Sequence, residues 1–393
     1  MGTDQIFDYA VIGKGLIGSA AARYLSATSD SVALIGPDEP SNWQTHDGVF
    51  ASHYDEGRIT RILDPDPVWA ALAKRAIAQY PAIKRESGIS FYHNSGGLRV
   101  IPDPEPVQAV GHDLDVTFHT HTDEALRQAF PYYRFPEGLT GLFEPEPAGY
   151  ISPRALVRAQ AAVAQQQGAQ IIRERATSLQ IQTTEVEITT AEGSSYHARK
   201  ALLAAGAYTS TLLDRKLDLT NRARTILLAE LPPDEQDRLK NIPTVIYTMQ
   251  GHPAFDGIYM LPPIRYPDGK VYLKIGANCP PPQTPQTFEA LKAWFHTRGD
   301  ATEARHLKDI LFDIIPGLNA VSFHTQPCVT CYTPTKRPFI DTLKENRLYV
   351  AAGGSGSAAK SSDAIGHLAA QLVLTSTWTD SLDRNLFKTS FVT

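Results

Sequence analysis

The chain has 393 residues, which is long for one ordinary hydrophobic core, so two domains are expected. Apolar residues make up 42 % and charged residues 20 %, which excludes general disorder, and the net charge of −5 argues against a nucleic-acid partner. Three cysteines (Cys279, Cys328 and Cys331) cannot build a disulfide framework, and no apolar run reaches the roughly 18 residues of a membrane span. We therefore expect a cytoplasmic protein with no membrane segment.

The first elements along the chain predict a βαβ unit. Residues 9–12 are a short apolar, β-prone run, residues 16–25 favour an alanine-rich helix, and residues 31–35 favour a second strand. A strand, a glycine turn, a helix and a strand within about 30 residues are the pattern of such a unit.

Two later stretches differ from this pattern, and a helix over residues 68–80 precedes them. Residues 88–143 alternate strand-like pieces at 89–91 and 98–101 with proline-rich loops at 101–106 and 143–147. Residues 222–326 are again rich in predicted strands, with turn signals at 267–269 and 280–282 and helices expected at 287–297 and 303–312.

Between and after these stretches the first pattern returns. Ser152 and Pro153 start a helix that runs through Gln167 and stops at Gly168. The other elements expected here are strands at 171–172, 179–181, 185–189, 196–203 and 348–352, the last followed by a helix through residue 373.

This order predicts two interleaved domains. One consists of residues 1–88, 149–221 and 327–393, and the other of residues 89–148 and 222–326. The predicted fold class is α/β (α+β overall), with a Rossmann-like domain and a β-sheet-rich substrate domain, discontinuous in sequence.

A glycine motif supports dinucleotide binding at the start of the chain. Residues 13–18 (GKGLIG) fit G-x-G-x-x-G directly after a strand and before a helix. Gly13 permits the tight turn, Gly15 lets the backbone approach a pyrophosphate, and Gly18 allows close packing of helix and strand. Leu16 and Ile17 then begin the helix, whose N-terminus attracts anions. The alternative is a glycine turn without a ligand.

The acidic residue expected at the end of the second strand is missing. Gly36 stands there, followed by Pro37, Asp38 and Glu39. These two carboxylates would repel the 2′-phosphate of NADP, whereas FAD held by other contacts remains compatible. Asp38 is the candidate for the adenosine ribose, with a solvated turn residue as the alternative.

Several ordered motifs resemble those of one flavoprotein family. Residues 52–61 (SHYDEGRITR) are similar to the S-H-x-x-x-x-R-x-x-R stretch of the sarcosine oxidase-like flavoproteins, in the D-amino-acid oxidase (glycine oxidase) superfamily. Further resemblances lie at residues 149–153 (GYISP), 204–208 (AAGAY), 272–276 (YLKIG), 331–335 with 339–341 (CYTPT and FID) and 351–360 (AAGGSGSAAK).

The resemblance implies an FAD-dependent oxidase of a secondary amine or amino acid. A bilobed fold is implied, in which an FAD-binding domain carries the flavin and a β-sheet domain closes over the ring. The partners expected are a small amine or amino acid and O2, in a monomer or small oligomer. The reaction would move a hydride equivalent from the carbon of a C–N bond to flavin N5, then reduce O2, giving an imine and H2O2.

The same resemblance assigns roles to four basic residues. Arg61 and Lys360 match positions that bind the substrate carboxylate, and Lys360 is also expected near the cofactor. Arg58 matches an arginine near the flavin ring, and Lys274 matches a lysine above the ring that assists O2 reduction. The alternatives are ordinary ion pairs for the arginines and a solvent-facing lysine on an edge strand for Lys274.

Other residues are expected around the flavin. By the resemblance, the cofactor-binding residues beyond the first glycine motif are His53, Ala205, Gly206, Gly353, Gly354, Ser355 and Gly356. The last four precede a predicted helix, so their backbone N–H groups would face the carbonyl edge of the flavin.

Three departures from the family fall at substrate-facing positions. Tyr54 replaces a second histidine, Met260 with Tyr259 beside it stands where a pocket tyrosine is expected, and Asn278 replaces a pocket histidine. We therefore infer that sarcosine is not the preferred substrate.

The cysteines leave the mode of flavin binding open. Cys328 and Cys331 form a C-x-x-C, which as a zinc site lacks a second pair and as a redox dithiol has no supporting context. In the family, a cysteine near the Tyr-Thr pair can bond covalently to the flavin, but Thr330 occupies that position here. We expect non-covalent FAD, with a covalent link through Cys331 as the alternative.

Other functions remain open at the level of sequence. One is a flavin dehydrogenase that uses another electron acceptor. A second is a tRNA-modification module, which the net charge disfavours, and a third is a non-catalytic flavin scaffold, which Arg61, Lys274 and Lys360 together disfavour. His119 and His121 would share one strand face but lack a third metal ligand.

Overall fold

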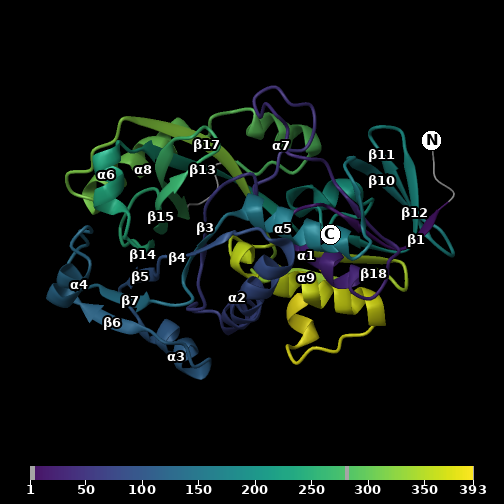
Figure 1. The fold of residues 1–393 in the computed structure, drawn as a ribbon, viewed down its shortest axis with the longest axis horizontal. Coiled ribbons are helices and arrows are strands. Elements are labelled where there is room, and N and C mark those ends of the chain that lie inside the picture. Colours follow the sequence, from purple (N-terminus) through teal and green to yellow (C-terminus); the bar gives the residue numbers. More distant parts are fainter. Residues whose placement is uncertain (1–4, 279–282, 393) are drawn as a thin grey trace.

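A computed structural model describes residues 5–278 and 283–392. Cys279 and the expected turn at residues 280–282 lie outside the described residues. The chain forms a mixed α/β fold with two large sheets and a small third one, as the sequence predicted (Figure 1). Among the described residues, no helix has both the length and the apolar character needed to cross a membrane.

The first large sheet has a parallel centre. Five strands run parallel in the order β9 (Gln170–Ile172), β2 (Val32–Ile35), β1 (Ile6–Ile12), β12 (Ser195–Leu203) and β19 (Leu348–Ala352). Three strands extend it antiparallel, namely β10 (Ala176–Ile181), β11 (Val186–Thr190) and β18 (Phe339–Lys344). The central strands are apolar on both sides because both faces of the sheet are covered.

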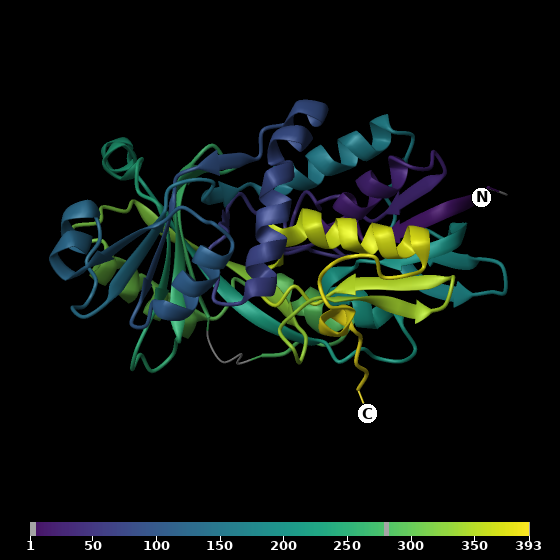
Figure 2. The ribbon, with the colours of Figure 1, turned by 90° about the horizontal axis from the view of Figure 1, so that it is seen from below.

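Four helices that are far apart in sequence cover one face of this sheet. They are α1 (Leu16–Ser26), α2 (Pro67–Ser87), α5 (Pro153–Gln166) and α9 (Ala358–Thr375). Helix α1 contacts both α5 and α9, and Figure 2 shows α9 beside the purple first segment of the chain. The short helix η2 (Arg384–Phe387) adds Phe387 to the same core.

The second large sheet is built from two separate stretches of the chain. Its strand order is β17 (Ser322–Tyr332), β13 (Thr220–Glu230), β16 (Val271–Asn278), β15 (Gly257–Arg265), β14 (Thr244–Thr248), β5 (Gly97–Ile101), β7 (Thr140–Glu144) and β6 (His119–Thr122). Alternate residues of these strands pack with α8 (Ala301–Ile314) and α6 (Pro233–Leu239) in one hydrophobic core. On the opposite face of the central strands, Leu228, Leu261 and Tyr272 form a separate cluster that packs against Ile59 and Tyr150.

Smaller elements connect the two sheets. The third sheet joins β3 (Arg58–Thr60), β8 (Gly149–Ile151) and β4 (Tyr92–Asn94), and the remaining helices are α3 (Glu105–Asp113), α4 (Asp123–Ala129), η1 (Gly206–Leu212) and α7 (Phe288–Phe295). The domain boundaries stay a prediction, and β17 runs without interruption across residue 327, where one boundary was expected.

Several predicted boundaries need correction. The strand expected at residues 89–91 is absent, and β4 begins at Tyr92 instead. Helix α3 begins at Glu105, at the end of a stretch that was expected to be a proline-rich loop. Pro106 is compatible with this helix because it occupies the first turn, where no backbone N–H is needed. Helix α2 extends to Ser87 although Pro81 lies inside it, and it ends at Gly88, which adopts the left-handed conformation.

Candidate active site

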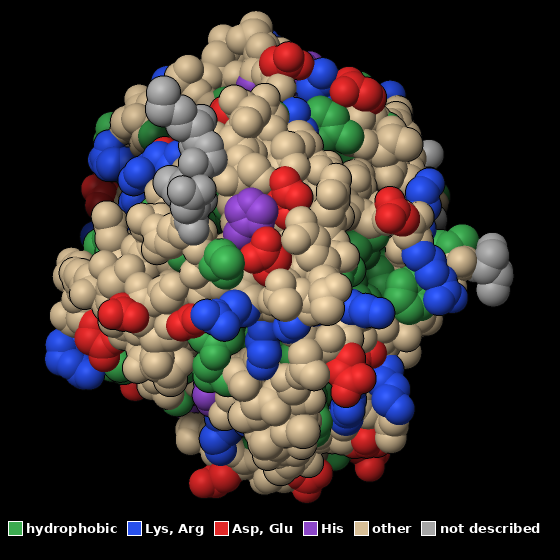
Figure 3. All heavy atoms as spheres, turned by 90° about the vertical axis from the view of Figure 1, so that its right-hand side faces the viewer, with side chains coloured by type: hydrophobic (Ala, Val, Ile, Leu, Met, Phe, Trp, Pro, Cys, Tyr) green, Lys and Arg blue, Asp and Glu red, His purple; other side chains and the backbone are tan. Residues whose placement is uncertain are grey.

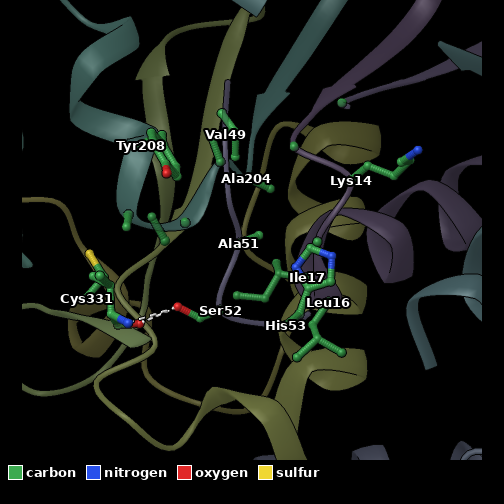
Figure 4. Close-up of a pocket in the computed structure, with 18 of the residues that line it drawn as sticks. Lys14, Leu16, Ile17, Val49, Ala51, Ser52, His53, Ala204, Tyr208 and Cys331 are labelled. Carbon is green, nitrogen blue, oxygen red and sulfur yellow. Dashed lines mark hydrogen bonds between the residues drawn. The ribbon is translucent and has the colours of Figure 1, made fainter. Parts of the chain in front are cut away.

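A cavity of about 540 Å³ lies at the carboxyl ends of the parallel strands. Gly13 follows β1, Gly36 follows β2, Ala204 follows β12 and Gly353 follows β19, and all four line the cavity. Ligands of open α/β sheets bind at this edge. Figure 4 shows Lys14, Ile17 and His53 on one side and Tyr208 and Cys331 on the other.

The glycine motif leaves no room for side chains at two of its positions. Gly13 has a φ of +113°, and a Cβ there would lie 2.3 Å from the carbonyl oxygen of Ala204. A Cβ on Gly18 would lie 1.8 Å from the carbonyl oxygen of Gly13, so strand and helix are in backbone contact. Gly15 caps helix α1 without a side-chain hydrogen bond, which leaves the first-turn N–H groups near Leu16 and Ile17 for a ligand.

A second glycine loop faces the first across the cavity. Gly353 and Gly356 have φ values of +82° and +80°, and the loop leads into helix α9 at Ala358. Gly353, Gly354 and Gly356 line the cavity, whereas Ser355 does not and instead donates its backbone N–H to the carbonyl of Cys331 at 2.8 Å. Two helix N-termini therefore open onto one cavity.

The lining of this cavity fits FAD. The hydroxyl of Thr330 is buried in the wall without a hydrogen-bond partner among the described residues. Uncapped helix N-termini suit a pyrophosphate, and an unpartnered hydroxyl suits the polar edge of a flavin. Ala205 and Gly206 also line the cavity, and their contact with the cofactor stays a prediction.

His53 and Tyr54 lie in the wall between the cavity and the second sheet. Burial, with Arg154 and Arg58 nearby, lowers the pKa of His53 to about 3, so this imidazole is neutral at physiological pH. Burial raises the pKa of Tyr54 above its ordinary value. Tyr54, Arg58 and Cys328 are shared with an adjoining cavity of about 120 Å³.

Arg58 and Lys274 meet at a carboxylate that the sequence reasoning did not assign. Lys274 has no exposed surface, and its Nζ donates to Asp55 Oδ2 at 2.5 Å and to the carbonyl of Gly57 at 2.7 Å. Arg58 forms an ion pair with the same Oδ2, and Tyr266 donates its hydroxyl to Asp55 Oδ1 at 2.8 Å. The sequence offered one signal for this role of Asp55, namely its place three residues before Arg58, an expected active-site arginine.

The position of Lys274 rules out the solvent-facing alternative. Strand β16 lies between β13 and β15, so Lys274 is on an interior strand, and Tyr272 shares its side of the sheet. Burial and Arg58 lower the pKa of the Lys274 amine, whereas the contact with Asp55 favours its protonated form.

Arg61 and Lys360 also converge on one carboxylate. Arg61 Nη2 is 3.3 Å and Lys360 Nζ is 3.2 Å from Oδ2 of Asp64, and Lys360 also donates to the carbonyl of Trp69 at 3.3 Å. Burial opposes ionisation of Asp64, but Lys360 and Arg61 outweigh it and lower the pKa of this carboxyl to about 2. Burial lowers the pKa of Lys360 to about 8, an effect that Asp64 limits.

Arg61 and Lys360 do not themselves line the cavity, although their neighbours do. Lys360 follows Ala359, which lines the cavity, and Arg61 lies three residues after Arg58, which also lines it. Their role as a carboxylate receptor stays a prediction.

The prediction for Met260 is wrong. Met260 has no exposed surface and lies in the core between the second sheet and helix α8. Tyr259 points to the opposite side, because side chains alternate along a strand, and its ring centroid is 5.7 Å from Lys274 Nζ. Asn278 is exposed at the end of β16 and lines neither of the two cavities, so its role stays a prediction.

Asp38 lies outside the cavity lining. It is exposed and forms ion pairs with Lys14 and, at 3.0 Å, with Arg173. Its predicted contact with the ribose stays a prediction.

The two cysteines of the C-x-x-C are free and buried. Cys331 lines the cavity, and burial raises the pKa of its thiol to about 12. Among the described residues, His, Cys, Asp and Glu form no group that could hold a metal ion. His119 and His121 lie on strand β6, and no third metal ligand joins them among the described residues.

Comparison with known proteins places the chain in a family. Residues 8–372 match the family described as FAD dependent oxidoreductase. The N-methyl-L-tryptophan oxidase of Yersinia pestis is 24 % identical over 371 residues, covering 93 % of this chain and 94 % of that protein.

Solved structures share the fold. NikD, an unusual amino acid oxidase essential for nikkomycin biosynthesis, superposes with a TM-score of 0.77 at 20 % identity, covering 99 % of this chain and 98 % of its own. The L-proline dehydrogenase of P. horikoshii gives a TM-score of 0.75 at 19 % identity, covering 98 % and 97 %. The match over nearly the whole chain, together with a glycine-lined cavity that fits FAD, establishes that the protein belongs to the FAD-dependent oxidoreductase family typified by D-amino-acid oxidase.

Proposed function

We propose that this protein is an FAD-dependent oxidase of a secondary amine or an amino acid. The observation that carries the proposal is Lys274, a fully buried lysine linked through Asp55 to Arg58, which lines the FAD cavity. A buried cation kept beside a flavin is suited to stabilising the negative charge that develops when O2 is reduced.

The chemistry divides between the cofactor and the chain. Bound FAD would supply the redox chemistry, as the acceptor of a hydride equivalent from the carbon beside the substrate nitrogen and the donor of two electrons to O2. The residues of the chain must hold the substrate so that this carbon is close to the flavin, which is a large part of the rate enhancement. Arg61 and Lys360, gathered around Asp64, are the proposed receptor for a substrate carboxylate.

The buried surroundings of the site suit an amine in its neutral form. The amine must lose its ammonium proton before the C–H bond can yield a hydride equivalent, and a buried wall disfavours charge on the nitrogen. Tyr54 lines the cavity wall beside Arg58. N-methyl and cyclic amino acids are therefore the substrates to examine first, in line with the named relatives.

A second candidate function is a dehydrogenase with another electron acceptor. The observation that favours it is the ion pair between Lys274 and Asp55, in which the carboxylate compensates the charge of the lysine and engages its Nζ. An L-proline dehydrogenase among the structures of the same fold agrees with this alternative.

The test is anaerobic mixing of the FAD-loaded protein with a panel of N-methyl and cyclic amino acids. We expect one of them to bleach the yellow flavin band, and air to restore the band with formation of H2O2. A betaine with a quaternary nitrogen is the matched control, because it has no lone pair to form an imine and must leave the band unchanged. A protein that binds no FAD would contradict the proposal, and a band that returns only with an artificial acceptor would assign the dehydrogenase.

A further inference from the structure

Arg99 is a buried arginine whose side chain makes no hydrogen bond within the part of the chain that the structure describes. It lies on β5, is only 9 % exposed, and makes no side-chain hydrogen bond, ion pair or cation–π contact with any residue in 5–278 or 283–392. A guanidinium carries five N–H donors and stays charged, so native structures rarely bury one without acceptors. This arrangement indicates that an acceptor from outside the chain completes the site.

The surroundings of Arg99 are charged. The charges of Arg61, Asp64 and Glu144 influence the ionisation of Arg99. Arg99 in turn acts on Lys360, and these five residues form one charged cluster. A Cβ on Gly97, which shares a side of β5 with Arg99, would lie 4.0 Å from Cβ of Arg61, so this side of the second sheet faces the Arg61 segment. Arg99 thus belongs to the same buried cluster as the proposed carboxylate receptor.

Neither carboxylate of the cluster is paired with Arg99. Asp64 bridges Arg61 and Lys360, and Glu144 accepts the backbone N–H groups of Ile62 and Leu63 at 2.9 Å each. The three cations Arg61, Arg99 and Lys360 therefore face the two carboxylates of Asp64 and Glu144, which gives the cluster a net charge of one positive unit. The Nε atoms of both Arg61 and Arg99 are buried without a hydrogen-bond partner among the described residues.

We propose that Arg99, together with Arg61, binds the carboxylate of the substrate between the two sheets. The left-over charge of the cluster matches one carboxylate, and two guanidinium groups offer it several donors. Lys360, held by Asp64, adds a third positive charge to this receptor. This inference rests on the proposed function and deepens it, because it selects amino acids with a free carboxylate over amines that lack one.

The test measures binding of a carboxylate that cannot be oxidised. Pyrrole-2-carboxylate is titrated into the FAD-loaded protein, with pyrrole-2-carboxamide as the neutral counterpart, and the change in the flavin spectrum gives Kd. Arg99→Met, which keeps the aliphatic stem, is compared with Arg99→Lys and with Arg158→Gln, an exposed arginine on α5. We expect Arg99→Met to raise Kd for the carboxylate by roughly 10- to 100-fold, with Arg99→Lys less affected and Arg158→Gln unchanged.

Thermal unfolding separates a ligand-binding role from a structural one. A structural arginine would lower the melting temperature when removed, whereas removal of an unpaired buried charge leaves the ligand-free protein as stable or more stable. The carboxylate should raise the melting temperature of the wild-type protein and not that of Arg99→Met.

The outcomes keep this inference distinct from the proposed function. If the wild-type flavin is reduced by an amino acid while Arg99→Met binds the carboxylate with unchanged Kd, or weakens carboxylate and amide equally, the role of Arg99 is wrong and the oxidase proposal stands. If no amine or amino acid reduces the wild-type flavin, the oxidase proposal itself fails. Should Arg99→Met not fold, Arg99→Lys decides the question. An unchanged Kd for pyrrole-2-carboxylate in Arg99→Lys would show that binding does not need the guanidinium group of Arg99.

Discussion

Asp55 is the residue on which two active-site cations depend. It is 3 % exposed and accepts from Lys274 and from Tyr266 while also pairing with Arg58. Removal of one partner from a buried ion pair leaves the other charge uncompensated, which costs far more than the pair itself contributes.

Asp55→Asn should therefore lower the free energy of unfolding by about 3–5 kcal/mol, because two buried cations lose their shared carboxylate. Urea denaturation of the FAD-loaded protein measures the loss. Asp237→Asn is the matched control, since Asp237 is an exposed partner of Lys240 and such a pair is worth about 0–1 kcal/mol. Equal effects of the two substitutions would show that Lys274 and Arg58 do not depend on Asp55 for stability.

Lys274→Met should slow reoxidation of the reduced flavin by O2 by about 10²- to 10³-fold, as expected for loss of one electrostatic stabiliser. Anaerobic reduction by the substrate should change much less. Stopped-flow mixing of pre-reduced protein with oxygenated buffer measures the rate. Lys270→Met, an exposed lysine just before β16, serves as the control. Unchanged reoxidation in Lys274→Met would contradict the role given to Lys274.

The pH dependence of carboxylate binding should report Lys360. Its pKa is about 8, below the ordinary value of 10.5, so the amine is charged below this pH and loses its charge as the pH rises through it. Affinity for pyrrole-2-carboxylate should therefore fall above about pH 8. Lys360→Met should bind more weakly and lose this limb of the profile. A wild-type profile that stays flat to pH 10 would contradict the assignment.

At the scale of elements, the turn between β1 and α1 decides whether FAD is held. Gly18 lies against the backbone of Gly13, and a methyl group there would have to displace the helix from the strand. The helix N-terminus and its N–H groups would move with it, away from the pyrophosphate.

Gly18→Ala should consequently lose bound FAD, with an affinity at least about tenfold lower, which corresponds to 1.4 kcal/mol. The ratio of flavin to protein absorbance after desalting measures the loss. Gly48→Ala is the control, because a Cβ at Gly48 would meet nothing within 4 Å. Retention of FAD by Gly18→Ala at the wild-type level would exclude this turn as the pyrophosphate site.

The elements also show what the sequence could and could not predict. The βαβ start, the helix after Ser152 and the last strand and helix were predictable, because capping residues, glycines and apolar periodicity are local signals. Met260 was misassigned because a register error of one residue moves a side chain to the other side of a sheet. The roles of Asp55 and Asp64 were not predictable, since their ion pairs with Lys274 and Lys360 join elements far apart in the chain. Nor was Arg99, whose burial beside Arg61 depends on the packing of the second sheet.

At the scale of the whole molecule, FAD should stabilise the assembly of the two sheets. The cavity takes residues from both, including Gly13 after β1 and Val329 in β17. Figure 3 shows acidic and basic side chains interspersed on one face of the molecule. Exposed ion pairs contribute little to stability, so these surface charges do not hold the two sheets together as bound FAD would.

Removal of FAD should lower the melting temperature, because a ligand that binds only the folded state stabilises it by mass action. Restoring FAD to 100 times its Kd should recover about 2.7 kcal/mol. Differential scanning calorimetry of the apoprotein with increasing FAD measures the shift, with riboflavin as the control that lacks the pyrophosphate. Equal stabilisation by riboflavin would contradict the role given to the glycine turn.

The most direct test of the central claim is oxygen consumption by the FAD-loaded protein with the amino acid that bleaches its flavin. We predict that O2 disappears and that one H2O2 forms for each substrate molecule oxidised to its imine. The opposite result would be that the substrate reduces the flavin while O2 is not consumed, and that turnover continues only when an artificial acceptor takes the electrons in place of O2.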